Sequence, residues 1–112
     1  MVDIREFHDP EGRSPFRDWL DNLNSEAAQK VTKALYRIGL GNFSNIKSVG
    51  AGILERKIHF GPGYRVYFGK DGERIIILLG GGTKQRQQND IRLALDRSED
   101  YKRRKRHQKE EE

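Results

Sequence analysis

The residues best suited to chemistry lie in one stretch past the middle of the chain, LERKIHFGPGYRVYFGKDGERIIILLGGGTK, residues 54–84. Apolar residues alternate there with ionisable ones, a pattern typical of β-strands. The ionisable side chains include a carboxylate, an imidazole and several cations, namely Glu55, Arg56, Lys57, His59, Arg65 and Lys84. An antiparallel sheet with one idle, solvated face would also carry charges. Arginine and lysine beside histidine, glutamate and tyrosine favour the other interpretation, a functional face.

Cleavage of an RNA strand is a reaction for which this set of side chains is suited. A base takes the proton of the 2′-hydroxyl, and the freed oxygen attacks the adjacent phosphorus. An acid then protonates the leaving 5′-oxygen, while cations stabilise the phosphorane-like transition state. The candidate bases are His59, Glu55 and Lys57. The guanidinium of Arg65 would clamp the phosphate through two donors.

Other residues of the stretch would hold the substrate. Lys84 and Arg86 follow the triple glycine, where a strand gives way to a helix, and would stabilise the leaving side. Backbone amides at a helix N-terminus would add to a positive cradle there. Tyr67 would stack on a base or donate a hydrogen bond, and Arg56 is a further candidate for substrate binding.

Several other chemistries lack the residues that they need. The chain has no cysteine, and of its three histidines His8 and His107 lie near opposite ends, so we expect neither a thiolate site nor a metal site. No serine lies in the strand region to act as a nucleophile. The glycines at 80–82 do not complete the pattern of a nucleotide-binding loop. The sequence therefore predicts no metal and no cofactor.

Positive charge is concentrated in the second half of the chain. The net charge is +5 over 112 residues; residues 1–54 are neutral, whereas residues 55–97 carry +4. This asymmetry favours a polyanionic partner, nucleic acid first, although solubility alone would also explain it. No apolar run approaches a membrane span, and MVDIREFHD lacks the order of a signal peptide. We therefore expect a cytoplasmic protein with no membrane partner.

The first half of the chain predicts a strand followed by a helical hairpin. Residues 2–7 alternate as in a short strand. Ser14 before Pro15 is typical of a helix N-cap, and Ser25 is predicted to cap the next helix. Apolar residues then recur at helical spacing, in a set that comprises Phe16, Trp19, Leu20, Leu23, Ala28, Val31, Leu35 and Ile38.

The second half predicts three antiparallel strands at residues 54–60, 64–68 and 74–79, ended by the triple glycine. If residues 61–63 form a three-residue loop, Phe60 lies opposite Tyr64. If Asp71-Gly72 is a two-residue turn, Lys70 lies opposite Glu73. A helix follows within residues 83–97. The charged residues 101–112 are expected to form a tail, disordered or locally helical, beyond a domain of residues 1–100.

Strand alternation divides these side chains between two faces. The core face, covered by the helices, is predicted to carry Ile58, Phe60, Tyr64, Val66, Phe68, Ile75, Ile77 and Leu79. The opposite, functional face is predicted to carry Glu55, Lys57, His59, Arg65 and Tyr67, beside Ile76 and Leu78. The fold class is therefore α+β, a twisted antiparallel sheet in the order β-α-α-β-β-β-α with the helical hairpin on one face.

Two segments, ERKIHFGPGYRVYF and LLGGGTKQRQQNDIRLA, resemble the RelE/HigB superfamily of toxins from bacterial type II toxin–antitoxin modules. More narrowly, they are similar to its phage-derived "addiction module killer protein" branch. The resemblance covers roughly residues 1–97. It implies a RelE-like fold and a metal-independent, ribosome-dependent endoribonuclease that cleaves mRNA. It also implies a cognate antitoxin, often a helix-turn-helix protein, as a partner besides mRNA and the ribosome.

The resemblance also assigns residues. It places Lys57 at the basic position of the first strand of the motif, Arg65 in the Tyr-Arg motif and Lys84 after the glycines. Glu55, Gln87 and Asp90 match the branch motif as well, whereas Thr83 stands where the branch usually has aspartate. Two alternatives remain: a ParE-like inhibitor of DNA gyrase, which would lack the basic set, and a non-catalytic RNA-binding module.

Overall fold

The computed structural model describes residues 1–111, with side chains through residue 109. In chain order the elements are β1 (Asp3–Glu6), α1 (Pro15–Asp21), α2 (Ser25–Gly39), β2 (Ile46–Gly50), β3 (Ile53–Ile58), β4 (Tyr64–Asp71), β5 (Ile75–Thr83), a 3-10 turn (Lys84–Arg86) and α3 (Gln87–Glu111). These elements confirm the predicted α+β class, and their topology is consistent with a RelE-like fold.

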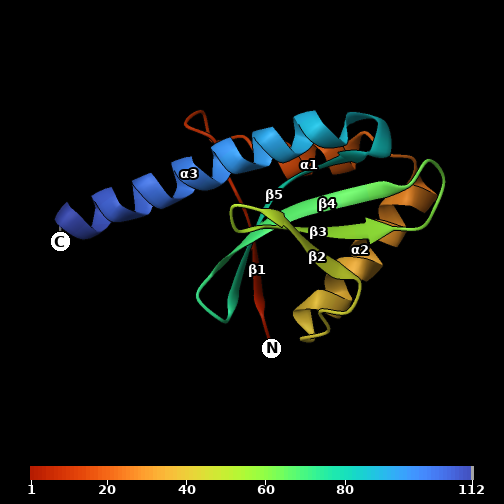
Figure 1. Cartoon of the computed structure of the whole chain (residues 1–112), viewed down its shortest axis with the longest axis horizontal. Helices are drawn as coiled ribbons and strands as arrows, with labels where there is room; N and C mark the ends of the chain where they lie inside the picture. The colour runs from red at the N-terminus through yellow and green to blue at the C-terminus, as the bar shows by residue number, and fades with distance from the viewer. Residues whose placement is uncertain (112) are drawn as a thin grey trace.

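The five strands form one sheet in the order β1-β5-β4-β3-β2 (Figure 1). Strands β2 to β5 are antiparallel neighbours, whereas β1 runs parallel to β5, so the sheet is mixed. The sequence analysis did not predict β2. Its sequence, IKSVG, has only two apolar residues, Ile46 and Val49, and neither is fully buried because β2 is an edge strand.

Side-chain caps start both helices of the N-terminal hairpin. The Ser14 hydroxyl accepts a hydrogen bond from the Arg17 amide at 3.0 Å, and Pro15 opens α1 as predicted. The predicted cap of α2 was one residue off. Asn24, not Ser25, has the extended backbone of an N-cap, and its side chain accepts from the Ala27 amide at 2.9 Å.

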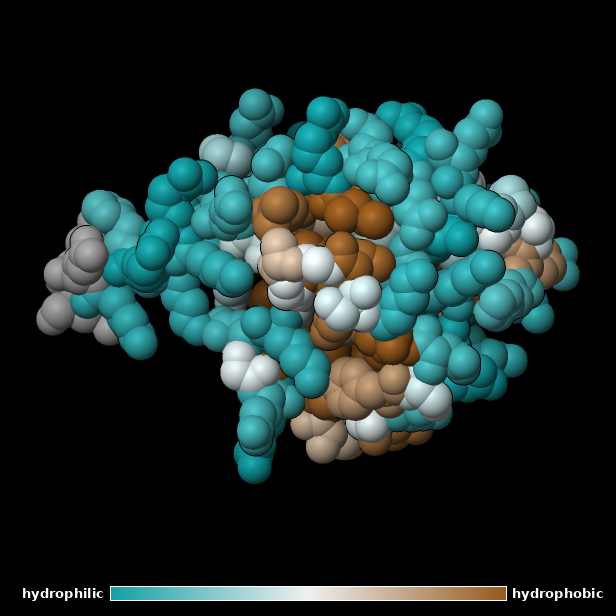
Figure 2. Space-filling view, viewed as in Figure 1, coloured by the Kyte–Doolittle hydropathy of each residue, from teal (hydrophilic) through white to brown (hydrophobic). Residues whose placement is uncertain are grey.

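Helices cover both faces of the sheet. Helices α1 and α2 pack on one face, where Phe16, Val31 and Ile38 meet Val66 and Phe68 in the core. Helix α3 lies across the other face (Figure 1), where its residue Ala94 belongs to a second core with Phe7, Ile53, Tyr67, Ile77 and Leu79. Figure 2 shows apolar side chains gathered beside α3 within a mostly polar surface. The predicted functional face is thus largely the floor of a second core.

The first hairpin differs from its predicted register by two residues. Ile58 lies opposite Tyr64 and Lys57 opposite Arg65, so the loop spans residues 59–63. An even shift leaves every side chain on its face. Glu55, Lys57, Arg65 and Tyr67 therefore share one face, as predicted.

The second hairpin was predicted in a wrong register, and the error is an odd number of residues. Asp71 lies opposite Ile75 across a three-residue loop. An odd shift moves side chains to the other face, so Ile77 and Leu79 face α3 while Ile76 and Leu78 face the helical hairpin. All four are buried. An apolar run with both faces buried gives no alternation from which the register could be derived.

The triple glycine continues β5 to Thr83 and does not end it, which corrects the prediction. Each glycine leaves room for a side chain from another element. A Cβ at Gly80 would collide with Arg97, one at Gly81 with the Trp19 ring, and one at Gly82 with Asp90. The glycines thus serve close packing of α1 and α3 on β5.

Helix α3 continues as far as Glu111, through the segment that was expected to be disordered or only locally helical; residue 112 lies outside the described residues. The Tyr101 hydroxyl donates to Asp71 at 2.6 Å, and the Lys105 ammonium pairs with the same carboxylate. Within the helix, Arg104 pairs with Asp100 at 2.6 Å. These contacts stabilise a helix that charge density alone did not predict. They hold α3 where it projects beyond the sheet, in a molecule of 46 × 28 × 25 Å (Figure 1).

Candidate functional site

The loop between β3 and β4 encloses a hollow of about 330 Å³, which we call the hairpin hollow. It is lined by Lys57, His59, Phe60, Gly61, Pro62, Gly63, Arg65 and Lys84. Four of the five residues predicted for catalysis meet here. They come from β3, the loop, β4 and the turn after β5, so the hollow requires the complete antiparallel meander.

Strand pairing determines how these residues come together. Lys57 lies directly opposite Arg65 across the β3–β4 ladder. Thr83, at the end of β5, lies opposite Tyr64, so the next residue, Lys84, emerges at the same end of the sheet. Lys84 is exposed, and His59 is exposed in the loop above. The hollow thus has two exposed side chains, His59 and Lys84, at its rim and two strand residues, Lys57 and Arg65, in its wall.

Arg65 lies in the wall of the hollow, and it is only 5% exposed. Its Nη1 donates to the Gly63 carbonyl at 3.2 Å, and its Nε lies 3.7 Å from a Glu55 carboxylate oxygen. The Nε itself has no hydrogen-bond partner among the described residues. The contacts with Gly63 and Glu55 therefore hold the guanidinium in one orientation at the wall of the hollow, and not all of its donors are used.

Glu55 lies beneath the hollow and does not line it. Its side chain is 4% exposed, and it accepts a hydrogen bond from the Gln87 amide at 2.8 Å. A carboxylate in this position is not placed to take a proton from a substrate in the hollow. Glu55 instead braces Arg65 and ties β3 to the first residue of α3, a structural connection that the strand pattern alone did not predict.

Tyr67 is fully buried under α3, so its ring has no free face for a base. Its hydroxyl has no hydrogen-bond partner among the described residues. Burial, together with the nearby Glu55 carboxylate, raises the pKa of Tyr67 well above its usual range. The structure therefore places Tyr67 in the second core and not on the substrate surface.

Asp90 also belongs to the layer beneath the hollow. It fills the space that Gly82 leaves open, and one of its carboxylate oxygens is buried without a hydrogen-bond partner. Burial raises the pKa of Asp90, and the opposing charges of Arg86 and Arg97 only partly offset that rise. Arg86 itself is exposed in the 3-10 turn and is not among the residues that line the hairpin hollow.

A second hollow, of about 290 Å³, lies between α2 and β3 and is called here the α2–β3 groove. It is lined by Lys30, Lys33, Ala34, Arg37, Asn45, Arg56, Ile58, His59 and Phe60. It contains Arg56, which points away from the hairpin hollow because it neighbours Lys57 on the strand. Burial, and then the nearby Arg37 charge, lower the pKa of Arg56. The sequence analysis missed the α2 cations, although their i, i+3, i+7 spacing places them on one helix face.

Apart from Arg65, which pairs with Glu55, the described lysines and arginines around these two hollows have no acidic partner. Among the described residues, no ion pair within 4 Å includes any of Lys30, Lys33, Arg37, Arg56, Lys57 and Lys84. In residues 1–109 there is also no group of three His, Asp or Glu side chains that could hold a metal ion. No helix in the described part is long and apolar enough to cross a membrane.

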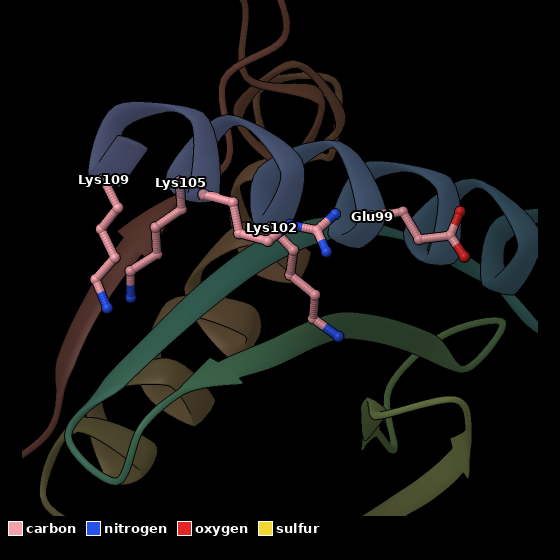
Figure 3. A pocket seen from close by; sticks show the side chains of 5 residues that line it. Glu99, Lys102, Lys105 and Lys109 are labelled. Carbon is pink, nitrogen blue, oxygen red and sulfur yellow. The ribbon is translucent and has the colours of Figure 1, made fainter. Parts of the chain in front are cut away.

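A third hollow, of about 370 Å³, lies at the other end of the molecule along the outer part of α3. Its lining is Glu99, Lys102, Lys105, Arg106 and Lys109, all from this one helix (Figure 3). Figure 3 shows Lys102, Lys105 and Lys109 extending to the same side of α3. This α3 patch is also basic, but it includes a carboxylate and brings in no other element.

The chain is similar to a known bacterial protein. The chain is 44% identical over 80 residues to an uncharacterized protein of Haemophilus influenzae, an alignment that covers 70% of this chain and 81% of that protein. No protein-family model matches the chain. Identity of this extent is well above what unrelated chains show, and the relative's name assigns no activity.

Proposed function

The chain belongs to the same family as the Haemophilus influenzae protein, and we propose that it is the toxin of a type II toxin–antitoxin module. Its fold resembles the RelE/ParE toxin core. The activity proposed is a metal-independent endoribonuclease that cleaves mRNA on the ribosome. Its proposed partners are mRNA, the ribosome and a cognate antitoxin. The resemblance of the sequence to the RelE/HigB superfamily implies that this antitoxin is a helix-turn-helix protein.

The observation that carries this proposal is the composition of the hairpin hollow. One imidazole and three cations line a single concave site, with no acidic side chain in the lining. A phosphodiester in the hollow would lie among groups that favour its negative charge and that become more favourable as charge develops in the transition state. An idle solvated strand face would not gather cations from two strands and from the turn after a third around one hollow.

The chemistry assigns a role to each group. His59 takes the 2′-hydroxyl proton, and the 2′-oxygen forms a bond to phosphorus as the bond from phosphorus to the 5′-oxygen breaks. The products are a 2′,3′-cyclic phosphate and a 5′-hydroxyl, which receives a proton from Lys84 or Lys57. Arg65 holds the non-bridging oxygens, and because Glu55 and Gly63 fix its guanidinium, little reorganisation is needed.

Mapping of mRNA 5′ ends after tightly induced expression tests the proposal. The wild type is compared with Arg65→Ala and with Lys102→Gln, a control in the α3 patch, after circular dichroism has verified that each variant is folded. New ends inside reading frames in the wild type and the control, lost in Arg65→Ala, are the expected result. Growth arrest without cuts contradicts it and indicates a protein target, which a gyrase supercoiling assay would examine. Neither arrest nor cuts indicates a non-catalytic RNA-binding module.

A further inference from the structure

We propose that the α2–β3 groove is a second RNA-binding site, which holds the single strand on one side of the bond positioned in the hairpin hollow. This inference rests on the proposed function for the identity of the ligand. Its structural basis is separate, because it concerns four cations that have no role in the cleavage chemistry: Lys30, Lys33 and Arg37 of α2, and Arg56 of β3.

The α2 cations form a row. Residues 30, 33 and 37 lie on one face of the helix, and all three side chains are exposed. At 1.5 Å per residue the row extends about 10 Å along α2. It is therefore long enough to contact more than one phosphate of an extended strand. The adjacent face of α2 carries Val31, Ala34 and Ile38 and packs on the sheet, so the row has a fixed orientation.

The cations of the groove repel one another, and no carboxylate in the described lining offsets this repulsion. Arg56 donates one hydrogen bond, to the uncharged carbonyl of Lys57. Arg37 is close enough to lower the pKa of Arg56 in addition to the effect of burial. No carboxylate lines the groove among the described residues. A bound polyanion would relieve this repulsion, whereas a neutral or cationic ligand would not.

The groove is continuous with the hairpin hollow. His59 and Phe60 line both, so they form the ridge between them. The Lys30 ammonium lies 5.5 Å from the centre of the Phe60 ring. A strand that leaves the hollow over this ridge meets an imidazole and an aromatic ring, against which an unpaired base can stack.

Two concave sites separated by an aromatic ridge fit a single strand better than a duplex. Bases of a single strand can turn into either hollow while the phosphates follow the cations. A duplex keeps its bases stacked inside and offers only its backbone to the protein. The groove is therefore expected to extend the recognised substrate by a short single-stranded segment next to the cleaved bond.

Binding of a 12-nucleotide RNA with every 2′-hydroxyl methylated tests the inference, because this probe cannot be cleaved. Fluorescence anisotropy would compare the wild type, a groove variant (Lys30→Gln, Lys33→Gln and Arg37→Gln) and a control variant (Lys102→Gln, Arg106→Gln and Lys109→Gln). Both variants lose three positive charges. A third variant, Lys30→Arg and Lys33→Arg, keeps the charge of the row and is expected to bind like the wild type.

The groove variant is expected to lose the larger part of its salt dependence. Each lost phosphate contact lowers the slope of log K against log salt by roughly 0.7 for a single strand, so three contacts lower it by about 2 and weaken binding about 100-fold at 0.1 M salt. The control is expected to change the slope little. An equal loss of RNA affinity in the groove variant and the control would overturn the inference. Tighter binding of a 12-base-pair duplex than of the single strand would also overturn it, and so would tighter binding of an acidic peptide by the wild type.

Cleavage of mRNA on translating ribosomes, measured in parallel, separates this inference from the proposed function. If the wild type cleaves nothing but the groove variant alone loses probe binding, the nuclease proposal fails and the groove stands. If the wild type cleaves and the groove variant binds the probe and cleaves as well as the control, the groove proposal fails and the nuclease stands.

Discussion

The two ends of the molecule carry similar numbers of cations and use them differently. At the α3 end, Arg103 and Arg104 pair with Asp100, and Lys105 pairs with Asp71. At the hairpin end, the cations of the groove and the hollow rim have no described acidic partner, and they come from several elements around concave surfaces. Arg103, Arg104 and Lys105 therefore help to hold a helix in place, whereas the unpaired cations at the hairpin end are available to a ligand. Net charge alone does not distinguish these two uses.

Replacement of the histidine at each end should give the widest separation between them. His59→Gln removes the proposed base and is expected to lower the rate of mRNA cleavage by about 10²-fold or more. His107→Gln makes the same chemical change on α3 and should leave the rate within a factor of two or so. Single-turnover cleavage on ribosomes measures both. Equal rates in the wild type and His59→Gln would remove the imidazole from the mechanism.

Removal of an acidic partner at each end should separate a buried pair from an exposed one. Glu55→Ala leaves the buried Arg65 guanidinium without its carboxylate and is expected to destabilise the protein by about 3 kcal/mol. Asp100→Ala removes the partner of two largely exposed arginines and should cost less than about 1 kcal/mol. Urea unfolding measures both losses. Similar values would show that the brace beneath the hollow is no stronger than a surface pair.

Acid should loosen the α3 end. Hydrogen bonds from Lys105 and then Tyr101 lower the pKa of Asp71, so the folded state favours the carboxylate. The resulting stabilisation is complete above the unfolded pKa of about 4 and is lost as the pH falls through the lower folded pKa. The free energy of unfolding of the wild type should exceed that of Asp71→Asn by about 1 kcal/mol at pH 6, and the two values should converge near pH 2. Urea titrations at several pH values measure this; a constant difference would contradict it.

Alkali should have a smaller effect at the same contact. Burial, then the hydrogen bond to Asp71, raises the pKa of Tyr101 to about 12. Neutral tyrosine is thus favoured in the folded state, and its stabilisation persists below the unfolded pKa of about 10 and declines as the pH rises toward 12. Tyr101→Phe should lack this decline. Unfolding between pH 8 and 11 tests it, and identical profiles for the two proteins would exclude the coupling.

Much of the candidate site could be predicted because the error in the predicted register of the first hairpin did not move side chains to the other face. The predicted register of this hairpin was wrong by two residues, and an even error keeps Lys57 and Arg65 on one face. Turn glycines and alternating polarity were sufficient for that result. In the second hairpin both faces of β5 are buried, so the polarity pattern could not reveal an odd error.

The remainder depended on tertiary packing. Glu55 and Tyr67 have the residue types of an active site, but α3 covers them, and the helical pattern of α3 does not state which face of the sheet it will cover. The α2 cations belong to a helix that was predicted from its apolar stripe, and the stripe does not include them. Their proximity to Arg56 follows from packing of α2 on β3, which local sequence does not specify.

The parallel pairing of β1 with β5 has a consequence for synthesis. Asp3 pairs with Ile75, so the first strand to leave the ribosome must wait for the last one before the sheet can be completed. Lys84, which completes the hairpin hollow, is translated later still. A chain whose translation stops within β4 therefore has neither a finished sheet nor a complete hollow. The order of the strands therefore delays completion of the sheet and of the hollow until β5 and Lys84 have been translated.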